Sequence, residues 1–451
     1  MKRKSPTASP PLALSTKARR MQESPISALI AAAVANPDLI SFAAGLVDPL
    51  TLPVDECAAI TQRILADRPF AQVALQYGTT QGLHPLREQL LKHLETLEGQ
   101  PATSFNLTAN DLVVTTGSQQ TLYLISDVLL DPGDIVIASN PSYFVFTSTL
   151  QSLGAQVLAV PVDEEGMDVE AIARLLEQLA ADGRLTKVKF IYCSSYFDNP
   201  TGLTLSLARR SRLMEIVQQF SREHRILILE DAAYRELRYD GPSLPSIKSF
   251  DKANQYTILT QTFSKPFAPG IKLGYTALPQ GLMDPILQQK GNHDFGSSNL
   301  CQAIALEAMR DGSYARHVNL LQQEYCRKRD AMLDALQKHM PSASGLYWTH
   351  PHGGIYIWIT FPPPIDTSRE TGIFQACVDR GVLYVPGDLS FHPDASGNVP
   401  RNHLRLNFAQ VAFEQIEPGI ARLAEVVKQH MSPGKSTTDF GSAHGVSGVI
   451  A

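Results

Sequence analysis

The sequence predicts an α/β protein in which helices cover both faces of a mostly parallel, seven-stranded sheet. Seven short apolar runs occur between residues 111 and 277, and helical patterns separate several of them. The chain has 451 residues, which is too long for one ordinary core and suits a large domain with a smaller companion. We expect the large domain to span 67–312. We expect a small α+β domain to combine 23–66 with 313–431, so that both ends of the chain meet.

Each predicted strand is a short run of apolar and β-branched residues. The runs are Asp111–Thr115, Ile135–Ala138, Gln156–Val160, Val188–Cys193, Ile226–Leu229, Tyr256–Leu259 and Leu273–Ala277. The clearest helical patterns between them are 118–130 and 206–222. Strands that are separated by helices favour parallel pairing, because each crossover helix returns the chain to the same edge of the sheet.

The two ends of the chain have the composition of disordered tails. Residues 1–22 are basic and rich in Ser and Pro, and residues 432–451 are rich in Ser, Gly and Thr. A mitochondrial targeting segment is the alternative for the first tail, although Pro10 and Pro11 weaken the amphipathic helix that it needs. We expect a cytoplasmic protein, or a mitochondrial one if the source is eukaryotic.

The composition is that of an ordinary globular protein without a nucleic-acid or membrane partner. The net charge is −5, and 18% of the residues are charged. No apolar run approaches the roughly 20 residues of a membrane span. The five cysteines are scattered without a CxxC pair, which indicates reduced thiols and no zinc site. His350 and His352 lack a third ligand, so no metal is expected.

Two polar segments follow predicted strands, at the sheet edge where α/β proteins bind ligands. The segment Thr115–Gln120 joins a strand to a helix, so its glycine and the helix N-terminus suit a phosphate. The alternative is an ordinary turn with Ser118 as the N-cap. The segment Phe197–Gly202 contains Asn199, whose amide could donate to a ligand oxygen, or it is a plain loop.

Two further segments after strands carry charge. Glu230 and Asp231 end an apolar run, where a carboxylate is costly unless it is paired, and Tyr234 follows three residues later. Lys265 lies among hydroxyl and apolar side chains. A partly desolvated lysine has a lowered pKa and can form a Schiff base, whereas a lone loop lysine is otherwise a solvated charge.

The four segments together match the needs of pyridoxal phosphate (PLP). The lysine would form the imine, and the buried carboxylate would keep the pyridine nitrogen protonated so that the ring acts as an electron sink. The amide of Asn199 and the hydroxyl of Tyr234 would bond the ring oxygen, while the segment around Gly117 would hold the phosphate.

Ordered motifs run from about Ser24 to Lys428. They are ISFAAGLVDPLTLP (40–53), LQYGTTQGLHPLR (75–87), VVTTGSQQ (113–120), NPSYF (140–144), DNPTG (198–202), EDAAYRE (230–236), TFSKPFAPGIKLG (262–274), GGIYIWI (353–359) and LRLNFA (404–409). In these motifs the chain resembles the class I/II aminotransferases of PLP fold type I, and most of all the branch of 2-aminoadipate and kynurenine/α-aminoadipate aminotransferases. The resemblance implies ping-pong transfer of an amino group from an α-amino acid to a 2-oxo acid such as 2-oxoglutarate.

The resemblance also implies a role for each site residue. Lys265 would be the catalytic residue, holding the cofactor and moving a proton between the substrate and cofactor carbons. Asp231 would pair with the ring nitrogen, Asn199 and Tyr234 with the ring oxygen, and Tyr143 would stack on the ring. The phosphate would be held by Gly117, Ser118, Gln119, Thr262, Ser264 and Lys272. Tyr77 would reach the phosphate of a neighbouring subunit, which implies a homodimer with shared sites. The substrate would be bound by Arg405 through its carboxylate, together with Gly45, Tyr77, Tyr143 and Asn199.

Three positions depart from the family pattern. Lys272 stands where the family usually has a phosphate-binding arginine, and Asp198 stands where it usually has Gln or His. Ser27 stands where aminoadipate-preferring relatives commonly have an arginine, which favours neutral aliphatic or aromatic substrates unless Arg19 or Arg20 supplies the charge.

Two other functions fit the same cofactor residues. One is a different PLP reaction, such as β-elimination or decarboxylation, because the fold permits several chemistries. The other is a PLP-sensing transcription regulator, which would carry a winged helix before the PLP domain. About twenty residues before Ser24 are too few for such a domain, so we expect an enzyme.

Overall fold

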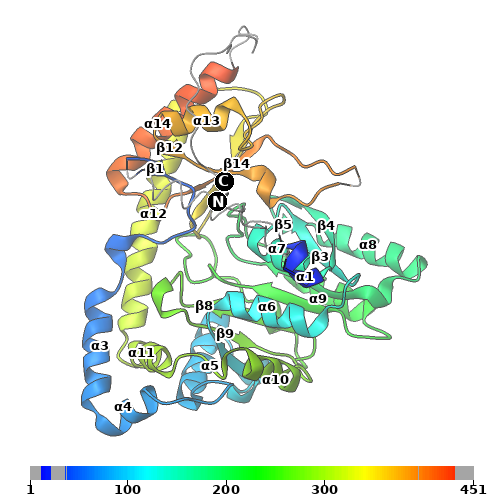
Figure 1. Ribbon diagram of the computed structural model, residues 1–451, viewed down its shortest axis with the longest axis vertical. Coiled ribbons are helices and arrows are strands. Elements are labelled where there is room, and N and C mark those ends of the chain that lie inside the picture. The colour runs from blue at the N-terminus through cyan, green and yellow to red at the C-terminus, as the bar shows by residue number, and fades with distance from the viewer. Residues whose placement is uncertain (1–11, 22–35, 37, 395, 432–451) are drawn as a thin grey trace, which may run out of the picture.

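The computed structural model describes residues 12–21, 36, 38–394 and 396–431 (Figure 1). Its centre is an eight-stranded sheet. The strands in spatial order are β2 (Leu112–Thr115), β9 (Gly274–Ala277), β8 (Thr257–Thr262), β7 (Leu227–Asp231), β6 (Val188–Ser194), β3 (Ile135–Asn140), β4 (Gln156–Asp163) and β5 (Gly166–Met167). The pairs from β8 through β7, β6 and β3 to β4 are parallel, while β9 runs antiparallel to both of its neighbours.

The α/β class and the seven predicted strands are confirmed, but the predicted strand count is one too low. The eighth strand, β5, pairs antiparallel with the end of β4 over the two residue pairs Val162–Met167 and Asp163–Gly166. Two residues are too few to show any hydrophobic period, so the sequence pattern could not reveal this strand.

Helices cover both faces of the sheet because successive strand residues point to opposite sides. Ile135 and Ile137 of β3 pack in one core with α8 (Val169–Ala181) and α9 (Leu207–Phe220). Val136 and Ala138 pack in another core with α6 (Ser118–Leu129), α7 (Phe144–Leu153) and α10 (Met283–Asp294). Burial on both faces explains why these strands are continuous apolar runs.

The two ends of the chain meet beside this sheet. Strand β1 (Ile40–Ser41) pairs in parallel with β12 (Val382–Leu383). A second sheet has the order β10 (Tyr347–Trp348), β11 (Tyr356–Thr360), β14 (His403–Asn407) and β13 (Val385–Pro386). The helices of this region are α12 (Ser313–His339), α13 (Gly372–Asp379) and α14 (Phe413–Met431). The buried Lys328 of α12 donates to Asp48 at 2.6 Å, which ties the two ends together.

Helices from the first part of the chain lie along the large sheet's outer side. They are α3 (Val54–Ala66), α4 (Arg68–Ala74) and α5 (His84–Glu98), and α11 (Asn299–Arg310) packs among them. Figure 1 shows α3 and α4 at the lower left edge of the molecule. Short 3-10 turns are η1 (Pro49–Thr51), η2 (Ala102–Phe105), η3 (Ala109–Asp111), η4 (Leu185–Lys187), η5 (Ile247–Phe250), η6 (Pro269–Ile271) and η7 (Gly387–Ser390).

The prediction of disorder throughout residues 1–22 is wrong for its last part. Helix α1 (Thr16–Arg20) is N-capped by the Ser15 hydroxyl, and Lys17 donates to the Tyr123 hydroxyl at 2.6 Å and to Asp127 at 3.2 Å. These partners lie on α6, so tertiary contacts that composition does not encode order this helix. Residues 1–11, 432–451 and Ser27 lie outside the described residues.

The expected free thiols are confirmed, since Cys57, Cys193, Cys301, Cys326 and Cys377 form no disulfide. Among the described helices, none combines the length and apolar character that a membrane span requires. The described residues also contain no cluster of three or more His, Cys, Asp or Glu side chains able to hold a metal ion.

Candidate active site

The polar segments predicted from the sequence lie at neighbouring strand ends. Ser194 at the end of β6 is paired with Asp231 at the end of β7, and Asp231 is paired with Thr260 of β8. On the other side of β8, Thr262 is paired with Gly274 of β9. The segments that follow these strands therefore converge on one edge of the sheet.

Lys265 follows β8 and lies in a partly buried position, which makes its charged form less favourable. Its Nζ donates to the carbonyl oxygen of Gly45 at 2.5 Å. Burial lowers the pKa of Lys265, and the nearby Arg405 lowers it further while Tyr356 opposes the shift. A lysine with a lowered pKa releases its proton more readily and becomes an amine nucleophile.

Asp231 is a buried carboxylate without a cation. It accepts from the Tyr192 hydroxyl at 3.1 Å and from the backbone N–H of Ala233 at 3.2 Å. Within the described part of the chain it forms no ion pair, and burial raises its pKa to about 6. A positively charged ligand group beside Asp231 would restore the ionised carboxylate, because opposite charges favour each other's charged forms.

Arg405 of β14 joins the second sheet to the Asn199 loop. Its Nη1 donates to the side-chain oxygen of Asn199 at 2.7 Å, and its Nη2 donates to the carbonyl oxygen of Ala43 at 2.9 Å. Its Nε is buried without a hydrogen-bond partner. A buried N–H group without a partner is unfavourable, so Arg405 keeps a free donor that a ligand carboxylate would satisfy. The pairing also leaves the amide N–H groups of Asn199 to donate elsewhere.

Tyr356 is a site residue to which the sequence assigned no role. Its ring lies under Arg405, with the guanidinium carbon 4.1 Å from the ring centroid, and its hydroxyl accepts from Tyr234 at 3.3 Å. Burial raises the pKa of Tyr234. For Tyr356 burial acts in the same direction, but the cations Arg405 and Lys265 outweigh it and the pKa is lowered. The motif GGIYIWI contains this tyrosine and was the available signal.

The close packing of Tyr356 explains the glycine at position 45. A Cβ on Gly45 would lie 2.6 Å from the Tyr356 hydroxyl, so a larger residue would displace that side chain. Gly45 therefore lies beside both Lys265 and Tyr356.

Helix α6 begins with an open N-terminus at the same edge. Gly117 is its N-cap, with φ of 75° and no side-chain cap, so the alternative with Ser118 as the N-cap is wrong. The space where a Cβ of Gly117 would lie has no atom within 4 Å. The N–H groups of Ser118 and Gln119 belong to the first turn and have no partner within the helix, which makes this end an anion site.

Hydroxyl side chains surround this helix end. Thr262 donates to the hydroxyl of Ser264 at 3.0 Å, and the backbone of Gly274 lies so close that its Cβ would be 2.8 Å from the Ser118 nitrogen. Lys272 adopts the left-handed conformation with φ of 50°. Lys272 is exposed, and its ammonium makes no hydrogen bond or ion pair within the described residues, so it is available to an anion.

Tyr143 borders the same region, whereas Tyr77 lies apart from it. The Tyr143 hydroxyl donates to Gln119 at 3.4 Å, and burial, with Tyr356 and Asp231 nearby, raises its pKa. Tyr77 is 87% exposed and contacts Phe295 at a ring-centroid distance of 6.3 Å. Among the described residues, Tyr77 makes no hydrogen bond or ring contact with the other predicted site residues.

Asp198, the departure beside Asn199, is buried rather than solvated. It accepts from the Thr201 hydroxyl at 3.1 Å. Burial raises the pKa of Asp198 to about 7, although hydrogen bonds from Thr201 and Ser194 oppose the shift. The site therefore contains two buried carboxyl groups, Asp198 and Asp231.

Comparison with known proteins gives consistent matches over nearly the whole chain. Residues 37–423 match the family described as aminotransferase class I and II. The aromatic-amino-acid aminotransferase 1 of Thermococcus litoralis is 36% identical over 92% of this chain and 94% of its own length. The kynurenine aminotransferase of Pyrococcus horikoshii, crystallised with pyridoxamine phosphate, has a TM-score of 0.84 and 35% identity, covering 93% of this chain and 98% of that one.

A third relative carries a cofactor–substrate adduct. The α-aminoadipate aminotransferase LysN of Thermus thermophilus, crystallised with N-(5'-phosphopyridoxyl)-L-leucine, has a TM-score of 0.78 and 30% identity. That match covers 92% of this chain and 97% of the other.

Proposed function

This chain belongs to the class I and II aminotransferases and depends on pyridoxal phosphate, and from this premise we propose that its amino donor is a neutral α-amino acid, aliphatic or aromatic. The amino acceptor is a 2-oxo acid such as 2-oxoglutarate. The proposal rests mainly on Arg405. Its guanidinium pairs with Asn199, and its buried Nε–H has no hydrogen-bond partner, so this donor is free for a substrate carboxylate. A different PLP reaction is not favoured, because relatives with 30–36% identity are aminotransferases.

The charges around the site support a neutral substrate. The positive charge of Arg405 works to lower the pKa values of Tyr143, Tyr234 and Lys265, which places it close to all three. We assign this arginine to the α-carboxylate of the substrate, so it cannot also pair with a side-chain carboxylate. Arg20 packs against Gly154, directly after α7, whereas Tyr143 directly precedes that helix. Ten residues of helix separate the two by about 15 Å, so Arg20 of the same chain is too far away to pair with a substrate side chain.

The residues of this chain fit the cofactor. Asp231 is a buried carboxylate without a cation, which suits a protonated pyridine nitrogen. The uncapped N-terminus of α6, the hydroxyls of Ser118, Thr262 and Ser264, and the ammonium of Lys272 suit a phosphate. Asn199 would donate to the ring oxygen, Tyr234 would do so by turning its hydroxyl away from Tyr356, and Tyr143 would cover the ring.

When bound, PLP supplies an electron sink that stabilises the negative charge left on the substrate Cα after its proton is removed. Lys265 would hold the cofactor, and its Nζ, as a free amine, would take the substrate's Cα proton as general base and give it back as general acid. Its lowered pKa makes this ammonium easier to deprotonate, which favours its use as a base. Arg405 holds the substrate carboxylate and thereby orients the Cα–H bond toward Lys265.

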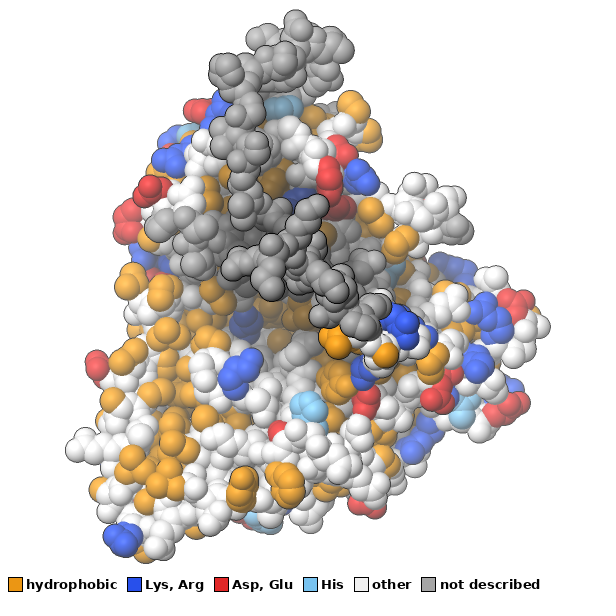
Figure 2. All heavy atoms as spheres, in the orientation of Figure 1, with side chains coloured by type: hydrophobic (Ala, Val, Ile, Leu, Met, Phe, Trp, Pro, Cys, Tyr) orange, Lys and Arg blue, Asp and Glu red, His pale blue; other side chains and the backbone are white. Residues whose placement is uncertain are grey.

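A homodimer with shared sites completes the proposal. Leu75 is 67% exposed, Tyr77 is 87% exposed and Phe295 is 74% exposed. In Figure 2 apolar side chains gather at the lower left, over the place of α3 and α4 in Figure 1. Exposed apolar groups in one region support an interface with a second copy. Tyr77 would then reach the phosphate bound by the neighbouring chain.

The test is an absorbance spectrum of the purified protein and of a Lys265→Ala variant. We expect a visible cofactor band that Lys265→Ala loses, together with a loss of activity of at least about a thousandfold. Leucine or phenylalanine should bleach the band of the wild type, and 2-oxoglutarate should restore it. A band that no amino acid bleaches would contradict transamination.

The choice of substrate is tested by kcat/KM values for leucine, phenylalanine and 2-aminoadipate. We expect the two neutral donors to exceed 2-aminoadipate, because a second carboxylate would lack a cation. The Thermus relative makes 2-aminoadipate the second candidate. A strong preference for 2-aminoadipate would overturn the neutral assignment and leave the transaminase assignment intact.

A further inference from the structure

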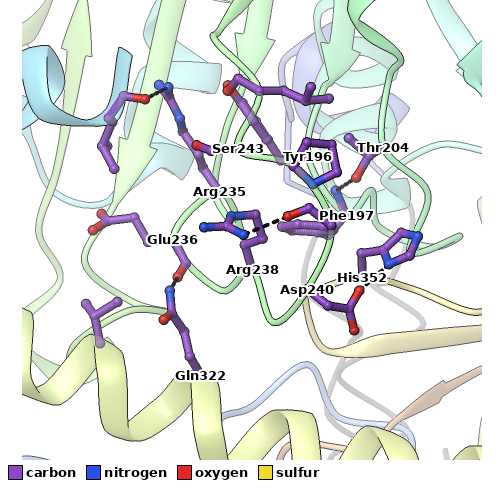
Figure 3. Close-up of a pocket in the computed structure, with 15 residues that line it drawn as sticks. Tyr196, Phe197, Thr204, Arg235, Glu236, Arg238, Asp240, Ser243, Gln322 and His352 are labelled. Atoms are coloured by element: carbon purple, nitrogen blue, oxygen red, sulfur yellow. Dashed lines mark hydrogen bonds and ion pairs between the residues drawn. The ribbon is translucent and has the colours of Figure 1, made fainter. Parts of the chain in front are cut away.

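A pocket of about 290 Å³ lies outside the cluster around Lys265, beside the loop that carries Asn199. Its walls come from the end of α5, the segments 196–204 and 235–244, helix α12 and His352. Figure 3 shows Arg238 and Phe197 between Glu236 on one side and His352 on the other. A volume near 300 Å³ suits a small organic molecule, and junctions between structural units are common places for such sites.

The pocket is mainly apolar, with a few polar groups at its edge. The apolar walls are formed by Leu97, Tyr196, Phe197, Pro242, Leu244 and Val318. Its carboxylates are already paired. Glu236 accepts from the Tyr314 hydroxyl at 2.6 Å, and Asp240 accepts from Arg329 at 2.6 Å. A cationic ligand would therefore find no unpaired carboxylate here.

Arg238 is the exception among the charged residues of this pocket. Its guanidinium donates to the carbonyl oxygen of Gly241 at 2.8 Å, and within the described residues it has no carboxylate partner. By contrast, Arg235 is paired with Glu98 at 2.5 Å. The hydroxyl of Ser243 lies in the same rim and makes no hydrogen bond among the described residues. These two groups would donate hydrogen bonds to a carboxylate, and an arginine fork binds that group well.

One wall of the pocket is connected to two active-site residues. Phe197 lies two positions before Asn199 and has φ of 47°, a left-handed conformation that is unfavourable for a residue other than glycine. Its ring packs so tightly that a Cβ on Gly353 would lie 2.6 Å from it. Gly353 and Gly354 are followed in the chain by Ile355 and then by Tyr356. Phe197 is therefore linked through the chain to Asn199 and, through its contact with Gly353, to the segment that carries Tyr356.

We propose that this pocket is a regulatory site for a small carboxylate with an aromatic or apolar body, and that Phe197 transmits its occupancy to Asn199 and Tyr356. The ligand's ring lies against Tyr196, Phe197 and Val318, and its carboxylate pairs with Arg238. A ligand that presses on Phe197 shifts a residue held in a strained conformation, which is the kind of position that conformational switches use.

The binding test uses the holoenzyme and naphthalene-2-carboxylate, which has no amino or 2-oxo group and so cannot be transaminated. Calorimetry should give one site per chain. Arg238→Gln should weaken binding at least tenfold, because a charge-assisted pair is lost. Leu97→Trp, which fills the pocket without removing charge, should do the same. Arg225→Gln is the matched control, because Arg225 also donates only to backbone carbonyls, at 2.8 and 3.1 Å.

The location of the probe is decided by Arg405→Gln. Retained binding in this variant, with loss in Arg238→Gln and Leu97→Trp, supports the pocket. Loss in Arg405→Gln alone would mean that the probe occupies the active site, and the inference would be wrong. Because binding is measured directly, this result does not depend on whether the enzyme transaminates the expected donors.

Steady-state kinetics test the regulatory half of the proposal. The probe should lower kcat by at least threefold at saturating amino acid in the wild type, and Leu97→Trp and Arg238→Gln should remove this inhibition. Inhibition that saturating amino acid abolishes, or binding without any change in kcat, would overturn the link through Phe197.

Discussion

At the residue scale, two buried carboxyl groups beside the cofactor site set a pH dependence for folding. Burial raises the pKa of Asp198 to about 7, whereas an unfolded aspartate titrates near 3.9. Between these pH values the native state binds a proton that the unfolded state has released. The free energy of unfolding of the cofactor-free protein therefore falls as pH rises through this range, by at most about 4 kcal/mol from this group.

We predict that Asp198→Asn removes most of this dependence. Urea unfolding of the cofactor-free protein at pH 5 and pH 8 should show a stability difference in the wild type that is clearly smaller in the variant, where Asp231, with its pKa raised to about 6, keeps the lesser part. The variant should thus be the more stable protein at pH 8. Asp334→Asn, at an exposed position of α12, should keep the wild-type dependence. Equal pH dependence in Asp198→Asn and the wild type would show that the pKa of Asp198 is not raised by folding.

Sequence reasoning works at the residue scale where a chemical group follows a strand. Lys265, Asp231 and Asn199 were predictable because each lies just beyond an apolar run and within a dense motif. Tyr356 was not, because its contact with Tyr234 joins residues 122 positions apart in the sequence. Nor was the pocket beside Phe197, whose wall depends on packing against Gly353 rather than on any local pattern.

At the element scale, the start of α6 shows what a helix N-terminus without a side-chain cap provides. Gly117 is the N-cap, and the free N–H groups of the first turn point to the open space around it. An alanine at position 117 would place a methyl group in that space and would strain the backbone, since φ is 75°. A bound phosphate would meet this methyl group.

We predict that Gly117→Ala weakens PLP binding at least tenfold while lowering stability by about 1 kcal/mol. The matched control is Gly183→Ala, because Gly183 also has positive φ, 68°, and nothing within 4 Å of its Cβ position. Both variants should lose similar stability in thermal unfolding of the cofactor-free protein, but Gly183→Ala should bind PLP normally in a fluorescence titration. If both variants bind PLP like the wild type, the phosphate does not lie at α6.

Long, buried helices and strands can be predicted from the sequence more reliably than short or exposed ones. The long apolar strands of the sheet were predicted with small errors at their ends, because burial on both faces leaves a continuous apolar run. Strand β5 and helix α1 were missed for opposite reasons. The first is too short to have a period, and the second is held by Lys17 against Tyr123 and Asp127, which are distant in the sequence.

At the scale of the whole molecule, the cofactor site is assembled from segments that the chain brings together from its two ends. Lys265 bonds to Gly45, and Arg405 bonds to Ala43 and Asn199. The pairing of β1 with β12 carries the first segment to the second sheet. Composition cannot show such pairing, because it depends on contacts between residues more than 300 positions apart.

Tyr77 is a predicted site residue that lies away from the site of its own chain. This leads to a prediction about assembly. If a second copy covers the exposed Leu75, Tyr77 and Phe295, the protein should sediment with twice the chain mass of 49.4 kDa. Leu75→Asp buries a charge in that interface, so it should shift the protein toward monomers and weaken PLP binding by removing the neighbour's Tyr77.

Leu207→Asp is the control, because Leu207 is also exposed but begins α9, far from α3 and α4 in Figure 1. Analytical ultracentrifugation over a range of concentrations distinguishes the two variants. A monomeric wild type with full PLP affinity would mean that Tyr77 has no part in holding the cofactor.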